Sequence, residues 1–170
     1  MPSDATPPTS LRALTPSDAG AVAQMVVLTM NWRGNEGWTL EKAQADENLW
    51  RYVHAWGEWA GDSGIAACDE EGLVLGACWS RLFPAETPGY GFVASDTPEI
   101  GLAVSGAARG QGLGSRLIDA HLQQLRAAGA PGVSLSVEDG NDRARALYAS
   151  RGFVTVGRNG DADTMLLRWG

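Results

Sequence analysis

The most constraining feature of this 170-residue sequence is a glycine-rich turn that joins an apolar strand to an amphipathic helix. Ile100, Leu102 and Val104 alternate as on a buried strand, and residues 112–127 carry leucines at helical spacing. Between them the chain runs Arg-Gly-Gln-Gly-Leu-Gly-Ser over residues 109–115. The first turn of a helix has unpaired N–H groups and the positive end of the helix dipole, and glycines keep Cβ atoms away. We therefore predict a cradle for a phosphate or pyrophosphate at this turn.

Two common phosphate-binding motifs explain the turn poorly. A P-loop is excluded because no Gly-Lys-Ser/Thr closes it. A dinucleotide fingerprint is closer, since Gly110-x-Gly112 follows a strand and Glu138 ends the next one, where a ribose-binding acid would lie. However, Ser115 occupies the third glycine position, and the 32 residues after Glu138 are too few for a doubly wound nucleotide domain.

A third motif accounts for the turn and for a segment downstream of it. The spacing Arg109-x-x-Gly112-x-Gly114 resembles the coenzyme A signature of the GNAT superfamily, the acyl-CoA-dependent N-acyltransferases. Residues 134–153 resemble the family's second motif, with an Asn at 141, Ala at 144, Leu-Tyr at 147–148 and Gly-Phe at 152–153. The resemblance is clear over residues 99–157 and extends more weakly to about residue 11. It implies an α/β (α+β) fold: a mixed, mostly antiparallel seven-stranded sheet flanked by four helices and splayed at the cofactor site.

The order of elements agrees with one GNAT domain over residues 11–170, preceded by a disordered tail over residues 1–10 that is rich in Pro, Ser and Thr. We expect helices from Thr15 to Met30 and over 40–56, 112–127 and 141–150. The expected strands are 11–14, 64–69, 73–83, 99–105, 132–138, 152–158 and 163–169.

Composition limits the binding partners and the cellular compartment that we expect for this protein. A formal net charge of −7 argues against a nucleic-acid or anionic-membrane surface. The sequence has neither a run of 18 apolar residues nor a signal peptide, and Cys68 and Cys78 give no disulfide framework. We expect a cytoplasmic protein with reduced cysteines and no metal.

The resemblance implies direct transfer of an acetyl group from acetyl-CoA to a primary amine. The amides of residues 110–115 would bind the pyrophosphate, strand residues 102–104 would pair with the pantetheine arm, and the Val104 amide would polarise the thioester carbonyl. The implied cofactor-binding residues are Leu102, Ala103, Val104, Arg109, Gly110, Gln111, Gly112, Leu113, Gly114, Ser115, Asn141 and Tyr148.

Two proton transfers need side chains. Tyr148 would protonate the departing thiolate, and the alternative is that it is a core aromatic residue. Asn141 lies seven residues earlier on the same helix face and would bind a pantetheine amide, cap the helix, or do both. Some relatives place a glutamate base where this chain has Ser136, so that mechanism does not carry over. Glu99, acting through water, is the first candidate base, with a solvated strand-end carboxylate as the alternative. Glu138 and His54 are weaker candidates, and His121 is expected in the core.

The acceptor is less constrained. Six of the 13 aromatic residues lie within residues 32–59, the region that usually forms the wall of the acceptor pocket in this family. Packing of the helices on the sheet explains these aromatic residues as well. The acceptor is therefore an unidentified small-molecule or peptide amine, and a homodimer is a common arrangement in the family. The alternative function is a catalytically silent acyl-CoA-binding sensor or regulatory module.

Overall fold

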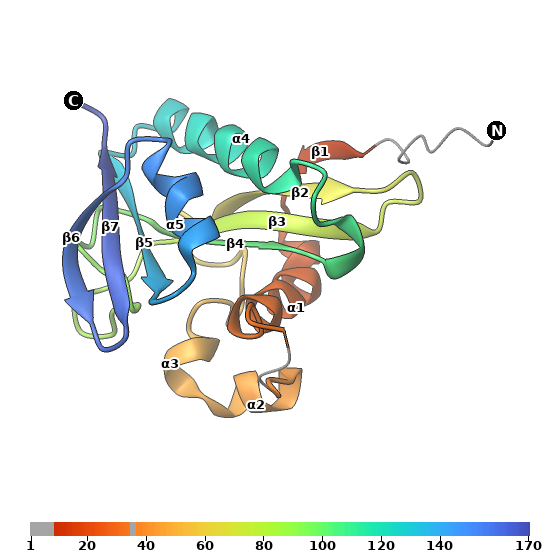
Figure 1. Cartoon of the computed structure of the whole chain (residues 1–170), viewed down its shortest axis with the longest axis horizontal. Helices are drawn as coiled ribbons and strands as arrows, with labels where there is room; N and C mark the ends of the chain where they lie inside the picture. The colour runs from red at the N-terminus through yellow and green to blue at the C-terminus, as the bar shows by residue number, and fades with distance from the viewer. Residues whose placement is uncertain (1–8, 35–36) are drawn as a thin grey trace.

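A single seven-stranded sheet organises the part of the chain that the computed structural model describes, residues 9–34 and 37–170 (Figure 1). Its strands are β1 (Ser10–Ala13), β2 (Ser63–Cys68), β3 (Val74–Arg81), β4 (Glu99–Val104), β5 (Gly132–Glu138), β6 (Val154–Asn159) and β7 (Ala162–Arg168). Their spatial order is β1-β2-β3-β4-β5-β7-β6, and every neighbouring pair is antiparallel except the parallel pair β4–β5. The mixed sheet expected from the resemblance is confirmed.

The sheet opens between its two central strands. β4 pairs with β5 only at Glu99 and Ser134, whereas β4 stays paired with β3, and β5 with β7, along their lengths. The loop between β3 and β4 lies against β5 beside this opening. A Cβ on Gly91 would come within 2.5 Å of the Leu135 carbonyl carbon, so only glycine allows so close an approach. The predicted splay is therefore present, and it begins at Glu99.

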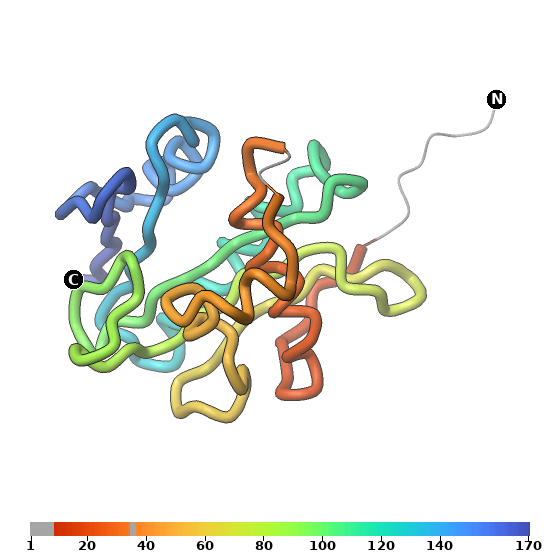
Figure 2. Tube along the Cα trace, turned by 90° about the horizontal axis from the view of Figure 1, so that it is seen from below, coloured from red at the N-terminus to blue at the C-terminus, as the bar shows by residue number. Residues whose placement is uncertain are grey.

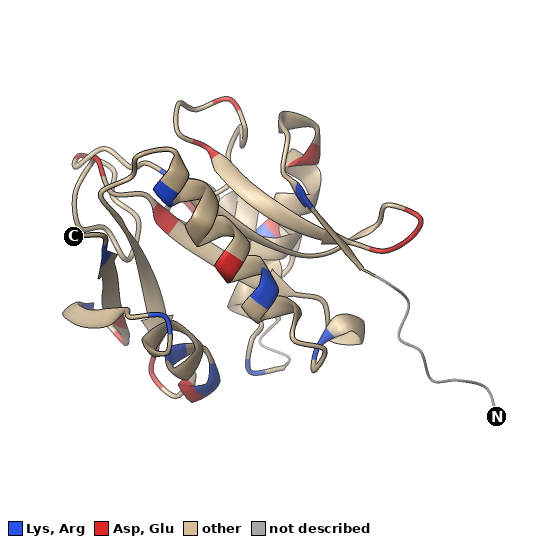
Figure 3. Cartoon of the chain, turned by 90° about the horizontal axis from the view of Figure 1, so that it is seen from above, with Lys and Arg blue, Asp and Glu red and all other residues tan. Residues whose placement is uncertain are grey.

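Helices cover the two faces of the sheet. α1 (Ala19–Met30), α2 (Leu40–Ala45) and α3 (Glu47–Trp50) pack on one face, and α4 (Leu113–Ala127) and α5 (Asp142–Ala149) lie on the other (Figures 1 and 2). Because successive strand residues point to opposite faces, Ala66 and Ala77 join the core under α1, whereas Ala67 and Cys78 join the core under α4. Seen from above, the outer surface of α4 carries charges of both signs (Figure 3).

The prediction of one helix over residues 40–56 is wrong. The helix stops at Ala45 because Asp46 adopts an extended conformation (φ −96°, ψ 103°) and caps α3, its carboxylate accepting from the Leu49 amide at 3.1 Å. After Trp50 the chain continues in turns, with a positive φ of 49° at Ala55. The described residues thus contain five α-helices, where four were expected, because the second is divided.

The N-terminal segment also differs in detail from the expectation. Pro16–Asp18 form a 3₁₀ turn before α1, and the Asp18 carboxylate accepts from the Thr15 amide at 2.8 Å. The predicted tail falls mostly on residues 1–8, which lie outside the described residues, and Ser10 already pairs with Cys68 in the sheet. None of the described helices is long and apolar enough to cross a membrane.

Candidate active site

A cavity of about 890 Å³ occupies the opening between β4 and β5. Its walls come from the C-terminal half of α1, from β4, from the loop that leads into α4, from the end of β5 and from the start of α5. Every sequence-predicted cofactor residue except Gln111 lines it, and so does Glu99. Residues that are far apart in the sequence therefore meet at the place where the sheet divides.

The glycine loop presents an open backbone surface to this cavity. Gly110 and Gly112 have positive φ angles of 78° and 74°, which L side chains rarely adopt. A Cβ at either position would meet nothing within 4 Å, so the space in front of the loop is empty of protein atoms. Gly112 is the N-cap of the 15-residue helix α4, whose first-turn amides have no partner within the helix. These amides and the helix dipole form a surface suited to an anion.

The free edge of β4 borders the same cavity. The Ser105 amide donates to the Leu75 carbonyl on the β3 side at 2.8 Å. Since backbone groups in a strand alternate between its two edges, the amides of Leu102 and Val104 face the opening, whereas that of Ala103 faces β3. The Arg109 guanidinium, exposed at the rim, donates from Nε to the Val104 carbonyl at 3.2 Å. Two backbone amides of β4 are thus available to an extended ligand, while Ala103 contributes only its position on the wall.

Helix α5 supplies the polar groups opposite β4. Asn141 is its N-cap and accepts from the Ala144 amide at 3.4 Å, so the capping role is present, and Asn141 also lines the cavity. Tyr148 is 8% exposed and its ring lies 5.8 Å from that of Phe153. Burial raises the pKa of the Tyr148 phenol above its ordinary value of 10, with a smaller contribution from Cys78. Tyr148 is therefore a protonated hydroxyl at the cavity wall.

Glu99 lies at the inner end of the cavity, where β4 and β5 separate, and is only 3% exposed. A solvated strand-end carboxylate, the alternative left open by the sequence, does not describe this environment. Burial raises the pKa of Glu99 to about 7, and the Tyr52 hydroxyl and, to a smaller extent, the Gly91 backbone amide oppose part of that rise. Oε2 accepts from the Tyr52 hydroxyl, whereas Oε1 has no hydrogen-bond partner among the described residues.

This geometry can be compared with known proteins. The family model described as Acetyltransferase (GNAT) family matches residues 27–153. The chain belongs to the GNAT acetyltransferase family. It is 32% identical over 148 residues to a mycothiol acetyltransferase from Amycolatopsis mediterranei, an alignment that covers 85% of this chain and 46% of that protein. The chain thus spans less than half the length of this relative.

Solved structures of the GNAT family share the fold at lower identity. The PaiA N-acetyltransferase from Thermoplasma acidophilum in complex with coenzyme A has a TM-score of 0.68 and 13% identity, covering 95% of this chain and 99% of that one. A phosphinothricin acetyltransferase from Sinorhizobium meliloti in complex with acetyl-CoA has a TM-score of 0.66 and 19% identity, covering 95% and 89%.

The other titratable candidates lie in less suitable places for this GNAT site. Glu138 is half-exposed and paired with Arg33 at 3.2 Å, and the exposed His54 does not line the cavity. His121 is fully buried between Ser80 (2.9 Å) and Gln124 (2.8 Å), and burial lowers its pKa to about 4. His121 is thus a core histidine, as expected. No group of three or more His, Cys, Asp or Glu side chains in residues 9–34 and 37–170 could hold a metal ion.

Most of the clustered aromatic residues are packing residues. Of the six within residues 32–59, only Trp32 and Tyr52 line the cavity. The packing residues are Trp38, Trp50 and Trp56 in the core under α1 and Trp59, which stacks on Arg81. Sequence reasoning missed two cavity aromatics, Trp79 and Tyr90. Trp79 lies opposite Gly101, where a Cβ would meet the indole at 2.5 Å, so a glycine inside a strand was the available signal.

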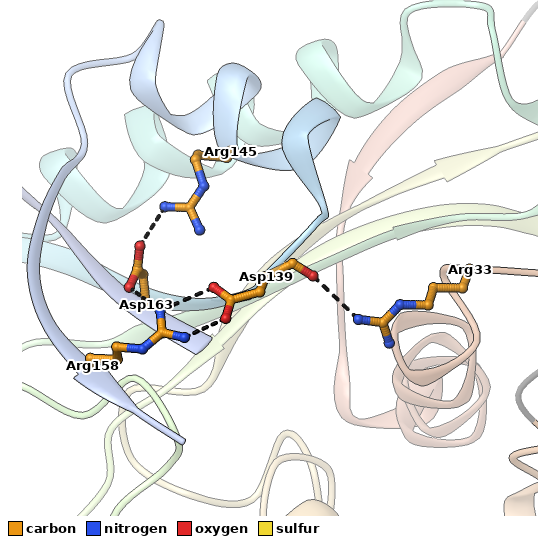
Figure 4. Close-up of polar contacts among 5 residues, drawn as sticks. All are labelled: Arg33, Asp139, Arg145, Arg158 and Asp163. Atoms are coloured by element: carbon orange, nitrogen blue, oxygen red, sulfur yellow. Dashed lines mark hydrogen bonds and ion pairs between the residues drawn. The ribbon is translucent and has the colours of Figure 1, made fainter. Parts of the chain in front are cut away.

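A chain of charged side chains links the two arms of the opening on the side of α1 (Figure 4). Arg33, just after α1, donates to the Asp139 carbonyl at 3.2 Å, and the Asp139 carboxylate pairs with Arg158. Arg158 and Arg145 share Asp163, at 2.9 and 2.6 Å. Because Arg33, Asp139 and Arg158 are about half-exposed, their contacts contribute little stability, but the whole chain of contacts connects the N-terminal arm to β5, β6 and β7.

Proposed function

We propose that this chain transfers an acetyl group from acetyl-CoA to a primary amine by direct attack of the amine on the thioester. The observation that carries the proposal is the convergence of three features on one cavity: an open anion-binding loop, a protonated tyrosine and a buried glutamate with one unpaired oxygen. Acetyl-CoA is the co-substrate that this arrangement would accept. The loop fits its pyrophosphate, and the free edge of β4 fits its extended arm.

The proposal assigns a residue to each step of the reaction. First-turn amides of α4 hold the pyrophosphate, and Asn141 and the Leu102 amide bond the pantetheine arm. Glu99 takes one proton from the acceptor ammonium through water, and the Val104 amide polarises the thioester carbonyl. The amine nitrogen then forms the C–N bond, the C–S bond breaks, and Tyr148 donates its proton to the leaving sulfur. The second proton of the nitrogen passes to the Tyr148 phenolate and restores its hydroxyl, and the proton held by Glu99 is released to solvent.

The test is release of free thiol from acetyl-CoA across a panel of amines, with the acetylated product identified by mass spectrometry. The panel includes the amine acetylated by mycothiol acetyltransferases, phosphinothricin, spermidine and a peptide with N-terminal alanine, because relatives or structural neighbours are named for these acceptors. Thiol release above hydrolysis with at least one amine supports the proposal. Tight binding of acetyl-CoA with no transfer to any amine would favour a silent acyl-CoA-binding module instead.

The proposal includes the organisation and location of the protein. Residues 11–170 form one domain, which is supported by strands from both ends of the chain in one sheet. A cytoplasmic location is supported by two buried free thiols, Cys68 and Cys78. A homodimer is supported by the exposed edge strand β6, whose Val154 and Val156 are both exposed. Sedimentation at equilibrium tests the dimer, and a monomer at all concentrations would contradict it.

A further inference from the structure

The one unexplained feature of the inner cavity is the way in which the Glu99 carboxylate is held. Its two oxygens differ: Oε2 is bound by the Tyr52 hydroxyl, and Oε1 is buried without a hydrogen-bond partner among the described residues. A buried carboxylate oxygen without a partner is costly, so a water or an N–H group that enters the cavity would be stabilised by binding it. The asymmetry therefore assigns one oxygen to the protein and leaves the other for an incoming N–H or water.

Tyr52 is well placed to impose this asymmetry. Its hydroxyl donates its proton to Glu99, and its oxygen accepts from the Tyr90 amide at 2.6 Å. The hydroxyl is therefore used both as a donor and as an acceptor. Its ring contacts Phe83 edge-on at 5.0 Å and stacks on Tyr90 at 6.0 Å. The loop between β3 and β4 packs closely against Tyr52 and Glu99. A Cβ on Gly89 in this loop would come within 2.6 Å of the Tyr52 hydroxyl oxygen and would collide with Glu99.

The turn that carries Tyr52 is held in place from β3. Arg81, the residue opposite Glu99 in the sheet, donates to the carbonyls of Arg51 (2.8 Å) and His54 (2.7 Å), which flank Tyr52. Its guanidinium is paired with Asp62 at 2.9 Å, and both side chains are 1% exposed. Because a buried Arg81 fixes the carbonyls on both sides of Tyr52, the phenol has little freedom to leave Glu99.

We propose that Tyr52 is a positioning residue for the proposed base: it binds Oε2 of Glu99, favours the carboxylate form and leaves Oε1 for the water that contacts the acceptor amine. The inference rests on the proposed function, in which Glu99 takes the proton of the acceptor. Other charged and titratable groups on the elements packed near Glu99 include Tyr90 from the loop, Arg81 from β3 with its partner Asp62, and Glu138 at the outer end of β5 with its partner Arg33. None of these binds the Glu99 carboxylate, so Tyr52 is its direct side-chain partner among the described residues.

The substitution Tyr52→Phe tests the inference because it keeps the ring and removes only the hydroxyl. Without that donor the anionic form of Glu99 loses stabilisation, so the pKa of Glu99 rises further, by about one pH unit. The pKa is measured by carbon-13 NMR of the glutamate side-chain carboxyls, with the Glu99 signal identified by its absence in Glu99→Gln. Tyr90→Phe is the matched control: it also loses one nearby phenol hydroxyl, but it retains the backbone amide and leaves the pKa of Glu99 unchanged.

The pH dependence of kcat/KM, measured on the same variants with the best amine, separates the positioning role of Tyr52 from the role of Glu99 as the base. If both are correct, the acid limb of Tyr52→Phe moves to higher pH by the same amount as the NMR titration, while acetyl-CoA affinity is unchanged. If the NMR titration of Glu99 does not move, Tyr52 is only a packing residue and the inference is wrong. If the titration moves but the kinetic limb does not, Glu99 is not the base, and its role in the proposed function is refuted together with the positioning role.

Discussion

Glu99 makes the stability of this protein depend on pH in a way that can be calculated. The pKa of its carboxyl rises from an ordinary value of 4.5 to about 7 in the folded chain, chiefly because the group is buried. A tenfold change in proton affinity corresponds to about 1.4 kcal/mol, so the folded state holds this proton more strongly by about 3 kcal/mol. The stabilisation is fully present below about pH 4.5, where the carboxyl is protonated in both states, and is lost as the pH rises through about 7.

The substitution Glu99→Gln removes this titration and keeps the shape of the side chain. We expect the free energy of unfolding of the parent, relative to Glu99→Gln, to fall by about 3 kcal/mol between about pH 4 and pH 8. Urea denaturation followed by tryptophan fluorescence, repeated across that range, measures the difference at each pH. Any constant effect of the amide cancels, because only the slope with pH is compared.

Glu138→Gln is the matched control, since Glu138 also lies on the cavity wall but is half-exposed and paired with Arg33. Its difference from the parent is expected to show no comparable loss of stability around neutral pH. If the difference between the parent and Glu99→Gln stayed flat from about pH 4 to pH 8, Glu99 would have an ordinary carboxyl pKa and the argument from burial would be refuted.

Three further predictions concern Tyr148 as the proposed acid, the glycine loop before α4 and the buried Arg81–Asp62 pair. Tyr148→Phe is expected to lower kcat by roughly 10²-fold with little change in acetyl-CoA affinity, and turnover near the parental rate would make Tyr148 structural. Gly114→Glu is expected to weaken acetyl-CoA binding in calorimetry much more than Gly114→Ala does. A Cβ at this position meets no protein atom closer than Leu147 at 3.9 Å, whereas the glutamate adds a negative charge beside the proposed pyrophosphate site; equal affinities of the two variants would refute the loop assignment. Asp62→Asn is expected to lower the free energy of unfolding by about 3 kcal/mol in urea denaturation, because it leaves the Arg81 charge buried without its counter-ion, and an unchanged midpoint would contradict that.

The strands were predictable because their signals are local, whereas the splay was expected only from the family resemblance. Alternating apolar residues placed β4 at 99–105, and it is observed at Glu99–Val104; the glycine spacing placed the start of α4 within one residue. The expected helix over 40–56 fails for two reasons. Its division at Asp46 has a local signal, because an Asp is a common N-cap and caps α3 here, but the apolar spacing alone did not separate the two helices. Its early end after Trp50 has no local signal, because Arg81, about 30 residues further along the chain, binds the carbonyls of Arg51 and His54 in the turns that follow.

The site was predictable where a motif names its residues and not where the fold brings residues together. Tyr148, Asn141 and the loop residues were named by the motif that they resemble, and all of them except Gln111 line the cavity. Tyr52 was noticed only as one aromatic among six, because its partner Glu99 is 47 residues away and their contact depends on the register of β4 against the loop. The two possible environments of Glu99 could be separated only by burial, which is a property of the whole fold.

Three glycines around the inner cavity constrain how this protein could acquire a new acceptor. A side chain at Gly89 would strike Tyr52 and Glu99, one at Gly91 would strike the backbone of β5, and one at Gly101 would strike the Trp79 indole. Mutations that reshape this end of the pocket from the loop or from β4 would therefore displace Glu99 or disturb the sheet. By contrast, Thr29 and Met30 line the same cavity from the end of α1 and are only partly buried. Laboratory selections for altered acceptor preference are thus expected to collect substitutions at the end of α1, while these three glycines stay unchanged.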